Sequence, residues 1–403
     1  MSGPVAVGAL AGPLARSASS RRPVRFLRLR TMARVGMRMM FHDTLKLAGT
    51  LFGVIFAVVL TNQQLGVFLG LLSKNTMYID HAGADLWIVP ASTQTLQGGK
   101  PVPMAALYEA RTTPGVAWAE PILFGGASVS LPSGGSEPVT LIGTRGPTWR
   151  GGPWNVVAGS MDALGRPDTM VFEDSERDKL GGLNIGSVRE VSGHRTVVGG
   201  FTWGLVPFGP SYAFAEFDYA RVLMGMPSDE ASFVLVGLAP GADRDAVVRS
   251  MQVRVAGTQV LSAQDFRNRV LRYLLVSTGI GVTTGTSTLF GLIVGLVIVS
   301  LSMFSSVVDN IREFGTLKAI GCRNRDLAVM LLVQSSIYAL LGSLIGLTQI
   351  SLIGEGIRSP KLALVLPWPA YAGTPLLMIV LCSLASMLAL MRIRNIEPAM
   401  VFR

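Results

Sequence analysis

The chain has 403 residues, of which 49% are hydrophobic and 15% are charged, whereas charged residues make up about 25% of a typical soluble protein. Its net charge is +10, from 35 lysine and arginine residues against 25 aspartate and glutamate residues. This apolar and basic composition excludes an intrinsically disordered chain, argues against a nucleic-acid-binding protein, and indicates a membrane protein whose positive charge is unevenly placed.

The first element is a basic N-terminal segment at residues 1–45. Nine basic residues but only one acidic residue precede residue 47. The first thirty residues are rich in Arg, Ser and Ala and resemble an organelle transit peptide, but we favour a cytoplasmic tail, or a start codon placed too early with Met32 as the true start. Residues 24–41 mix arginine with apolar side chains, which suits either a helix lying on the membrane surface or a simple charged anchor.

Four long runs lack Asp, Glu, Lys and Arg, apart from Asp309, and lie at residues 47–73, 273–310, 327–354 and 362–391. A membrane-spanning helix needs about 20 apolar residues, so each run predicts one span. The second run begins with a Gly- and Thr-rich part, which places its span at 289–308 and predicts a stalk or hinge before it. The predicted boundaries are a tail at 1–45, a span at 46–73, an outer domain with its stalk at 74–272, a span at 273–308, a connecting segment at 309–326, a span at 327–354, a loop at 355–370, a span at 371–391 and a tail at 392–403.

The distribution of lysine and arginine predicts the orientation, because these residues accumulate on the cytoplasmic side of a membrane. The segment between the second and third spans carries four basic residues, and the segment between the third and fourth spans carries two. Both chain termini and the segment near residue 315 are therefore expected in the cytoplasm. Residues 74–270 are expected on the outside, in a periplasm-like compartment.

The expected outer domain has 17 basic and 19 acidic residues, as an ordinary soluble domain would. Strand patterns and helix patterns alternate irregularly, which predicts a mixed α+β domain of about 200 residues. The predicted strands are residues 84–89, 116–124, 127–131, 139–143, 187–191, 194–198 and 231–238. The predicted helices are residues 104–111, 175–180, 218–224, 243–255 and 263–273.

Two segments of this domain attract attention. The loop at residues 199–214 carries Phe201, Trp203, Phe208 and Tyr212 among glycines and prolines. These aromatic side chains form either an apolar surface for a lipid or protein partner, or part of the domain core. The acidic cluster at residues 173–178 lacks the spacing of a calcium-binding loop and is interpreted as a solvated helix start.

Sequence patterns for catalysis are missing. The chain has no GxxxxGK[ST] phosphate loop, no GxSxG, no HExxH and no catalytic Cys–His spacing, so neither an enzyme nor a cofactor of its own is expected. Its two cysteines and three histidines are scattered, and no metal site or disulfide is expected. No span carries a charged residue near its middle, which argues against ion-coupled transport.

Glycine pairs four residues apart occur in three of the expected spans. They are Gly66 and Gly70, Gly291 and Gly295, and Gly342 and Gly346. Small residues at this spacing let two helices approach closely, either within one chain or across a dimer. Glycine is also common in spans, so chance remains the alternative interpretation.

The connecting segment between the second and third spans contains EFGTLKAIG at residues 313–321. The pattern predicts a short amphipathic helix at residues 311–320 that ends at Gly321. This helix is either a rigid protrusion on the inner face or a simple interfacial turn.

EFGTLKAIG resembles the E-x-G-x-L-[KR]-A-[IL]-G signature of the FtsX/MacB/LolC-type ABC permeases. The order of one span, a large outer domain, three spans and a short tail is also similar, and the resemblance covers residues 33–403. The ending NIEPAMVFR, at residues 395–403, is similar to that of DevC-type members, with Glu397 where aspartate is usual. Residues 197–223 also resemble the outer domain of that subgroup.

The resemblance implies an α-helical membrane protein with four transmembrane helices and a mixed α+β, MacB-like periplasmic core domain inserted between the first two. It implies a permease in the bacterial inner membrane that works with a separate ATPase, which binds the ATP and Mg. It also implies a permease homodimer, a membrane-fusion adaptor, an outer-membrane duct and an amphiphilic or lipid-like cargo. The ATPase would contact Glu313, Phe314, Gly315, Thr316, Leu317, Lys318, Ala319, Ile320 and Gly321. Activation of a cell-wall hydrolase, as in FtsX, and lipoprotein release, as in LolC and LolE, are the alternatives.

Overall fold

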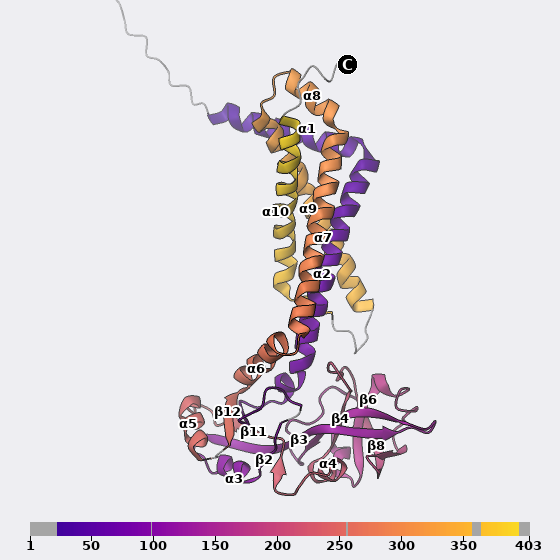
Figure 1. The fold of residues 1–403 in the computed structure, drawn as a ribbon, viewed down its shortest axis with the longest axis vertical. Coiled ribbons are helices and arrows are strands. Elements are labelled where there is room, and N and C mark those ends of the chain that lie inside the picture. Colours follow the sequence, from indigo (N-terminus) through magenta and orange to yellow (C-terminus); the bar gives the residue numbers. More distant parts are fainter. Residues whose placement is uncertain (1–21, 98, 255–256, 357–363, 395–403) are drawn as a thin grey trace, which may run out of the picture. The chain divides into compact units, whose positions relative to one another are not determined.

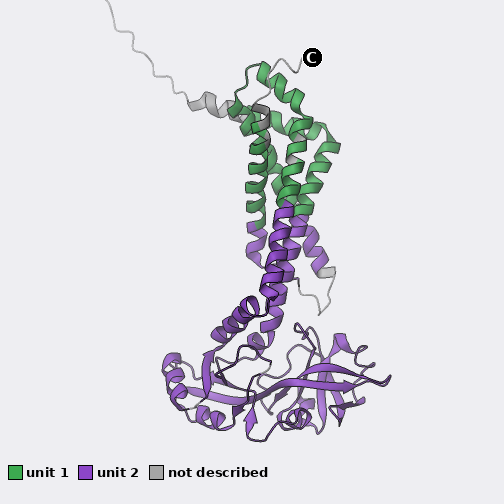
Figure 2. Cartoon of the chain, in the orientation of Figure 1, with its two compact units in different colours: residues 1–57, 296–345, 374–403 green, residues 58–295, 346–373 purple. Residues whose placement is uncertain are grey.

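A computed structural model describes residues 22–97, 99–254, 257–356 and 364–394 (Figure 1). The ending at 395–403, the first 21 residues and residues 357–363 of the predicted loop lie outside the described residues. The chain divides into two compact units (Figure 2). The first unit comprises residues 1–57, 296–345 and 374–403, and the second comprises residues 58–295 and 346–373.

Among the residues that the structure describes, four helices are long and apolar enough to cross a membrane, as predicted. They are α2 (Thr44–His81), α7 (Ile280–Asp309), α9 (Asn324–Gly356) and α10 (Trp368–Arg394), and a separate helix, α1 (Arg22–His42), precedes them. Helix α2 has 38 residues and is therefore about 57 Å long, whereas the hydrocarbon core of a bilayer is about 30 Å thick. It continues well beyond the predicted end of the first span at residue 73.

The segment predicted as a stalk or hinge contains a break between two helices, α6 (Ala263–Val276) and α7. The backbone at Gly279 has a φ of +73°, which glycine adopts without strain. The Gly- and Thr-rich residues that follow belong to α7 itself. Their hydroxyls donate hydrogen bonds to carbonyls of the preceding turn, including Thr283 to Gly279 at 3.1 Å and Thr288 to Thr284 at 2.9 Å. Such bonds satisfy polar side chains inside an apolar helix.

The outer domain contains a ten-stranded mixed sheet in the order β12-β1-β11-β3-β4-β9-β6-β8-β5, with β7 paired to β3 and β8. The strands are β1 (Leu86–Pro90), β3 (Val116–Ser130), β4 (Ser136–Thr144), β5 (Val156–Gly159), β6 (Thr169–Glu173), β7 (Val188–Val191), β8 (His194–Thr202), β9 (Tyr212–Glu216), β11 (Phe233–Leu238) and β12 (Thr258–Ser262). A small second sheet pairs β2 (Val102–Pro103) with β10 (Glu230–Ala231). The helices are α3 (Ala105–Arg111), α4 (Phe217–Met224) and α5 (Arg244–Arg254).

Strand β3 joins the two halves of the large sheet. Its first half pairs with β11 and its second half pairs with β4. The sequence predicted two strands here, separated at Gly125–Gly126. That prediction was wrong because both glycines pair in register with β4, at Leu141 and Thr140.

The large sheet separates two hydrophobic clusters. Along β1, Leu86 and Ile88 lie in one cluster while Trp87 and Val89 lie in the other, as expected from the alternation of side chains along a strand. The second cluster is rich in aromatic side chains and includes Tyr78 of α2 and Phe266 of α6.

Trp87 connects the two helices that enter the outer domain. Its ring lies 6.0 Å from that of Tyr78 and 5.3 Å from that of Phe266, between centroids. The Tyr78 hydroxyl also donates a 2.9 Å hydrogen bond to the carbonyl of Gly151. The outer ends of α2 and α6 are therefore packed into the domain core.

Candidate functional site

The predicted amphipathic helix is present as α8 (Ile311–Ala319). It ends where the amides of Gly321 and Cys322 donate to the carbonyls of Lys318 and Leu317, at 3.1 and 3.0 Å. Gly321 has a φ of +101°, so a residue with a Cβ would be strained there.

One side of α8 is packed against its own unit. Phe314 is only 1% exposed and lies in a cluster with Val307 of α7 and three residues of α9, Leu327, Met330 and Leu331. Gly315 is also buried. Such a fully buried phenylalanine fixes a short helix that is too short to be stable alone.

The other side of α8 is open. Glu313, Thr316, Ala319, Ile320 and Gly321 are exposed, and Leu317 and Lys318 are half-buried. Ile320 is 83% exposed, which is unusual for a branched apolar residue on an ordered turn. The nine residues named from the sequence therefore fall into two groups, with Phe314 and Gly315 facing inward and the others wholly or partly accessible.

The six glycines of the predicted packing pairs are all buried. A Cβ added to Gly342 of α9 would lie 2.5 Å from Val54 Cγ1 of α2, within the first unit. In the second unit, a Cβ on Gly66 would lie 3.0 Å from Leu366 Cδ1, and one on Gly291 would lie 3.1 Å from Gln64 Cγ. Gly342 thus occupies the tightest of these three contacts.

Replacing Gly342 with leucine is expected to destabilise the first unit by about 1–3 kcal/mol, because a larger side chain must displace Val54 from α2. Gly373 on α10 provides a matched control, since a Cβ there meets nothing within 4 Å. Thermal unfolding of the full chain in detergent compares the two variants. Equal melting temperatures for Gly342→Leu and Gly373→Leu would contradict the packing assignment.

The aromatic loop of the outer domain divides between core and surface. Phe201 is fully buried and Tyr212 is 2% exposed, because Phe201 is the penultimate residue of β8 and Tyr212 is the first residue of β9, both inside the sheet. The prediction that Phe201 and Tyr212 belong to a partner surface is therefore wrong, and both side chains are part of the domain core. Trp203 and Phe208 lie between these strands and are 40% and 63% exposed. Burial raises the pKa of the Tyr212 hydroxyl, so this side chain stays neutral in the core.

A buried carboxylate holds this loop. Glu173, at the end of β6, is fully buried and accepts hydrogen bonds from the amides of Gly204 and Leu205, at 2.8 and 3.0 Å. It also accepts from the hydroxyls of Thr202 and Ser175, at 3.1 and 2.9 Å. The interpretation of the acidic cluster as a solvated helix start was therefore wrong for Glu173, because donors about thirty residues later in the sequence replace its water.

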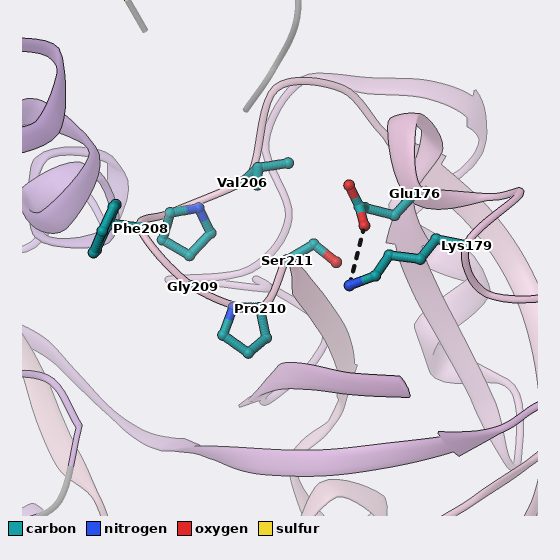
Figure 3. Close-up of a pocket in the computed structure, with 8 residues that line it drawn as sticks. Glu176, Lys179, Val206, Phe208, Gly209, Pro210 and Ser211 are labelled. Carbon is teal, nitrogen blue, oxygen red and sulfur yellow. Dashed lines mark ion pairs between the residues drawn. The ribbon is translucent and has the colours of Figure 1, made fainter. Parts of the chain in front are cut away.

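A cavity of about 270 Å³ lies beside the loop (Figure 3). Val206 to Ser211 form one wall, and Glu176 and Lys179 form the polar wall toward which the Ser211 hydroxyl points. The Lys179 ammonium lies 2.9 Å from a carboxylate oxygen of Glu137 and 3.9 Å from one of Glu176. Its hydrogen bond to Glu137 raises the pKa of Lys179, so the ammonium is charged at neutral pH. The cavity thus combines an apolar, proline-rich wall with fixed charges.

Among the described residues, no three His, Cys, Asp or Glu side chains lie close enough together to hold a metal ion. Two accessible features match the residues named from the sequence: the open side of α8 in the first unit, and the loop bearing Trp203 and Phe208 in the second.

Comparisons with known proteins agree with this arrangement. The family model described as "MacB-like periplasmic core domain" matches residues 47–253, about half of the chain, and the one described as "FtsX-like permease C-terminal" matches residues 285–398. An uncharacterized ABC transporter permease of Mycobacterium tuberculosis, Rv2563, is 28% identical over 152 residues. Another from that organism, Rv0072, is 29% identical over 112 residues.

These matches are partial. They cover 36% of this chain and 40% of Rv2563, and 27% and 31% respectively for Rv0072. Among solved structures, the extracellular domain of the ABC-type transporter YknZ from Gram-positive bacteria matches with 14% identity and a TM-score of 0.33, over 44% of this chain and 99% of that one. The periplasmic region of MacB from Actinobacillus actinomycetemcomitans matches with 7% identity and a TM-score of 0.35, over 46% and 91%. From the two family matches, the chain belongs to the FtsX/MacB superfamily of ABC transporter permeases.

Proposed function

We propose that this chain is the permease subunit of an export complex in which a separate ATPase binds the open side of α8. The observation that carries the proposal is the division of α8 into an anchored side, at Phe314, and an exposed side that includes Glu313 and Ile320. A helix fixed by its own unit can transmit force, and an exposed apolar residue beside charges suits a protein contact. ATP and Mg would be bound by the ATPase.

Movement of α8 would reach the outer domain through continuous helices. Helix α7 ends at Asp309, two residues before α8 begins, and continues back to the hinge at Gly279. Beyond the hinge, α6 enters the domain core beside Trp87, as does the outer end of α2. Rearrangement in the membrane would therefore change the outer domain without requiring cargo to pass between the spans.

The complex would act from the bacterial inner membrane, with both termini of the chain in the cytoplasm and the outer domain in the periplasm. Two permeases would pair, and a membrane-fusion adaptor and an outer-membrane duct would complete an export path for an amphiphilic or lipid-like cargo. The exposed Trp203 and Phe208, beside the cavity at Lys179, are the surface that best suits the adaptor or the cargo. Their loop is held in place by Glu173, which lowers the entropy lost on binding.

An Ile320→Asp substitution tests the ATPase contact. Because Ile320 is 83% exposed, the change should leave the melting temperature unchanged while reducing the ATPase that copurifies in mild detergent at least tenfold. Val253→Asp, at an 88% exposed position of the outer domain, is the matched control and should retain the ATPase. Normal recovery of the ATPase with Ile320→Asp would refute the contact.

Mass spectrometry of the same preparation distinguishes export from signalling. A cell-wall hydrolase in place of an adaptor would favour signalling over export.

A further inference from the structure

A second cavity, of about 300 Å³, lies in the first unit between α2 and α7. Its walls are formed by Lys46, Gly49 and Thr50 of α2 and by Leu301, Ser302, Ser305 and Asp309 of α7. A cavity of this size lies at the lower end of the range of small-molecule sites, so it suits a headgroup-sized ligand.

The cavity contains two opposite charges. Lys46 forms a 3.1 Å ion pair with Asp43, which leaves the other N–H bonds of its ammonium able to bind an anion. Asp309 accepts a 3.3 Å hydrogen bond from the hydroxyl of Ser305, and in the described part of the chain it forms no ion pair with a basic side chain. The charges of Lys46 and Asp309 interact through space, but among the described residues the two side chains form no ion pair with one another.

Both charges lie at the boundary of the apolar helix segments. Lys46 is the last charged residue before the apolar run of α2, and Asp309 is the only charged residue in the run of α7, close to its end. Lipid headgroups occupy this level of a bilayer, and charged side chains at helix ends commonly reach it. Leu301, which is 66% exposed, supplies an apolar wall on the side of the hydrocarbon core.

We propose that this cavity binds a phosphoethanolamine group. The Asp309 carboxylate would accept hydrogen bonds from the primary ammonium while keeping its bond from Ser305. Lys46 would bind the phosphate together with the hydroxyl of Ser302. Charge-assisted hydrogen bonds of this kind are the strong ones, and an ammonium that donates N–H bonds is recognised where a trimethylated one is not. The group would come from phosphatidylethanolamine in the membrane or from a soluble phosphoethanolamine compound.

Native mass spectrometry of the full chain in detergent tests the site, with phosphatidylethanolamine, phosphatidylcholine and phosphatidylglycerol of identical acyl chains as probes. The expected result is about tenfold preference for phosphatidylethanolamine over phosphatidylcholine, lost in Asp309→Asn. Lys46→Gln should weaken phosphatidylethanolamine and phosphatidylglycerol alike. Glu313→Gln removes a nearby negative charge outside the cavity and should keep the preference. The same lipid preference in Asp309→Asn as in the unaltered chain, or none in the unaltered chain, would overturn the proposal.

Soluble phosphoethanolamine distinguishes the two sources. Displacement of the bound lipid at equal concentration, abolished by Asp309→Asn, would support the site with a soluble ligand. Binding of the lipid alone would support the site with a membrane ligand. Binding of either compound that is unaffected by both Asp309→Asn and Lys46→Gln would overturn it.

Discussion

Replacing Phe314 with alanine is expected to loosen α8 from its unit by about 3–5 kcal/mol, since the phenylalanine is 1% exposed and packs against α7 and α9. The helix has nine residues, and isolated helices of this length are unstable in water, so the loss should release α8 locally. Hydrogen exchange measures this directly, and the amides of α8 should exchange at least a hundredfold faster than in the unaltered chain. If the proposed function holds, ATP-driven export should fall as well, while the chain stays in the membrane.

The control for this substitution lies on the same segment. Ile320→Ala removes a side chain that is 83% exposed and should change the stability of α8 by less than about 0.5 kcal/mol. If both variants exchange at the same rate as the unaltered chain, Phe314 does not anchor the helix.

Replacing Glu173 with alanine is expected to destabilise the outer domain by about 2–4 kcal/mol. The change leaves the buried amide of Leu205 and the amide of Gly204 without their acceptor, while the Thr202 hydroxyl keeps only its bond to the carbonyl of Phe172. The aromatic loop should lose protection from hydrogen exchange, and Trp203 should report the change in its fluorescence. The stability of Glu173→Gln should lie between those of the unaltered chain and Glu173→Ala. The glutamine keeps one acceptor oxygen but turns an amide group toward the donors.

Asp178 is the matched control because it is an exposed carboxylate in the same acidic stretch. Asp178→Ala should leave the melting temperature and the loop unchanged. A Glu173→Ala variant that melts like Asp178→Ala would show that the loop is held by other contacts.

The membrane helices were the most predictable part of the fold, because a span is recognised from a run of apolar residues without knowledge of its neighbours. Strands β6 and β9 were missed because their residues are almost all buried, so no alternation of apolar and polar residues marks them. Strand β3 was predicted as two strands separated at Gly125–Gly126, because glycine in a strand pattern often marks an interruption. Only the pairing of these glycines with β4 shows that the strand continues.

The sites were less predictable than the helices. The signature at residues 313–321 identified α8, but the inward direction of Phe314 depends on Val307 and Met330, which pack from two other helices. Phe201 and Trp203 are two residues apart, yet one is fully buried and the other is 40% exposed, because strand β8 ends at Thr202 between them. The two backbone amides that donate to Glu173 come from a loop about thirty residues later, which no local pattern indicates.

Site-specific photo-crosslinking at Ile320 tests the central claim most directly. A photoreactive amino acid is placed at Ile320, 83% exposed, and in a separate chain at Val253, 88% exposed in the outer domain. Position 320 is expected to crosslink to the ATPase subunit in intact cells, and position 253 is not. Absence of an ATPase crosslink at position 320, or equal crosslinking at both positions, would contradict the claim that the open side of α8 is the ATPase contact.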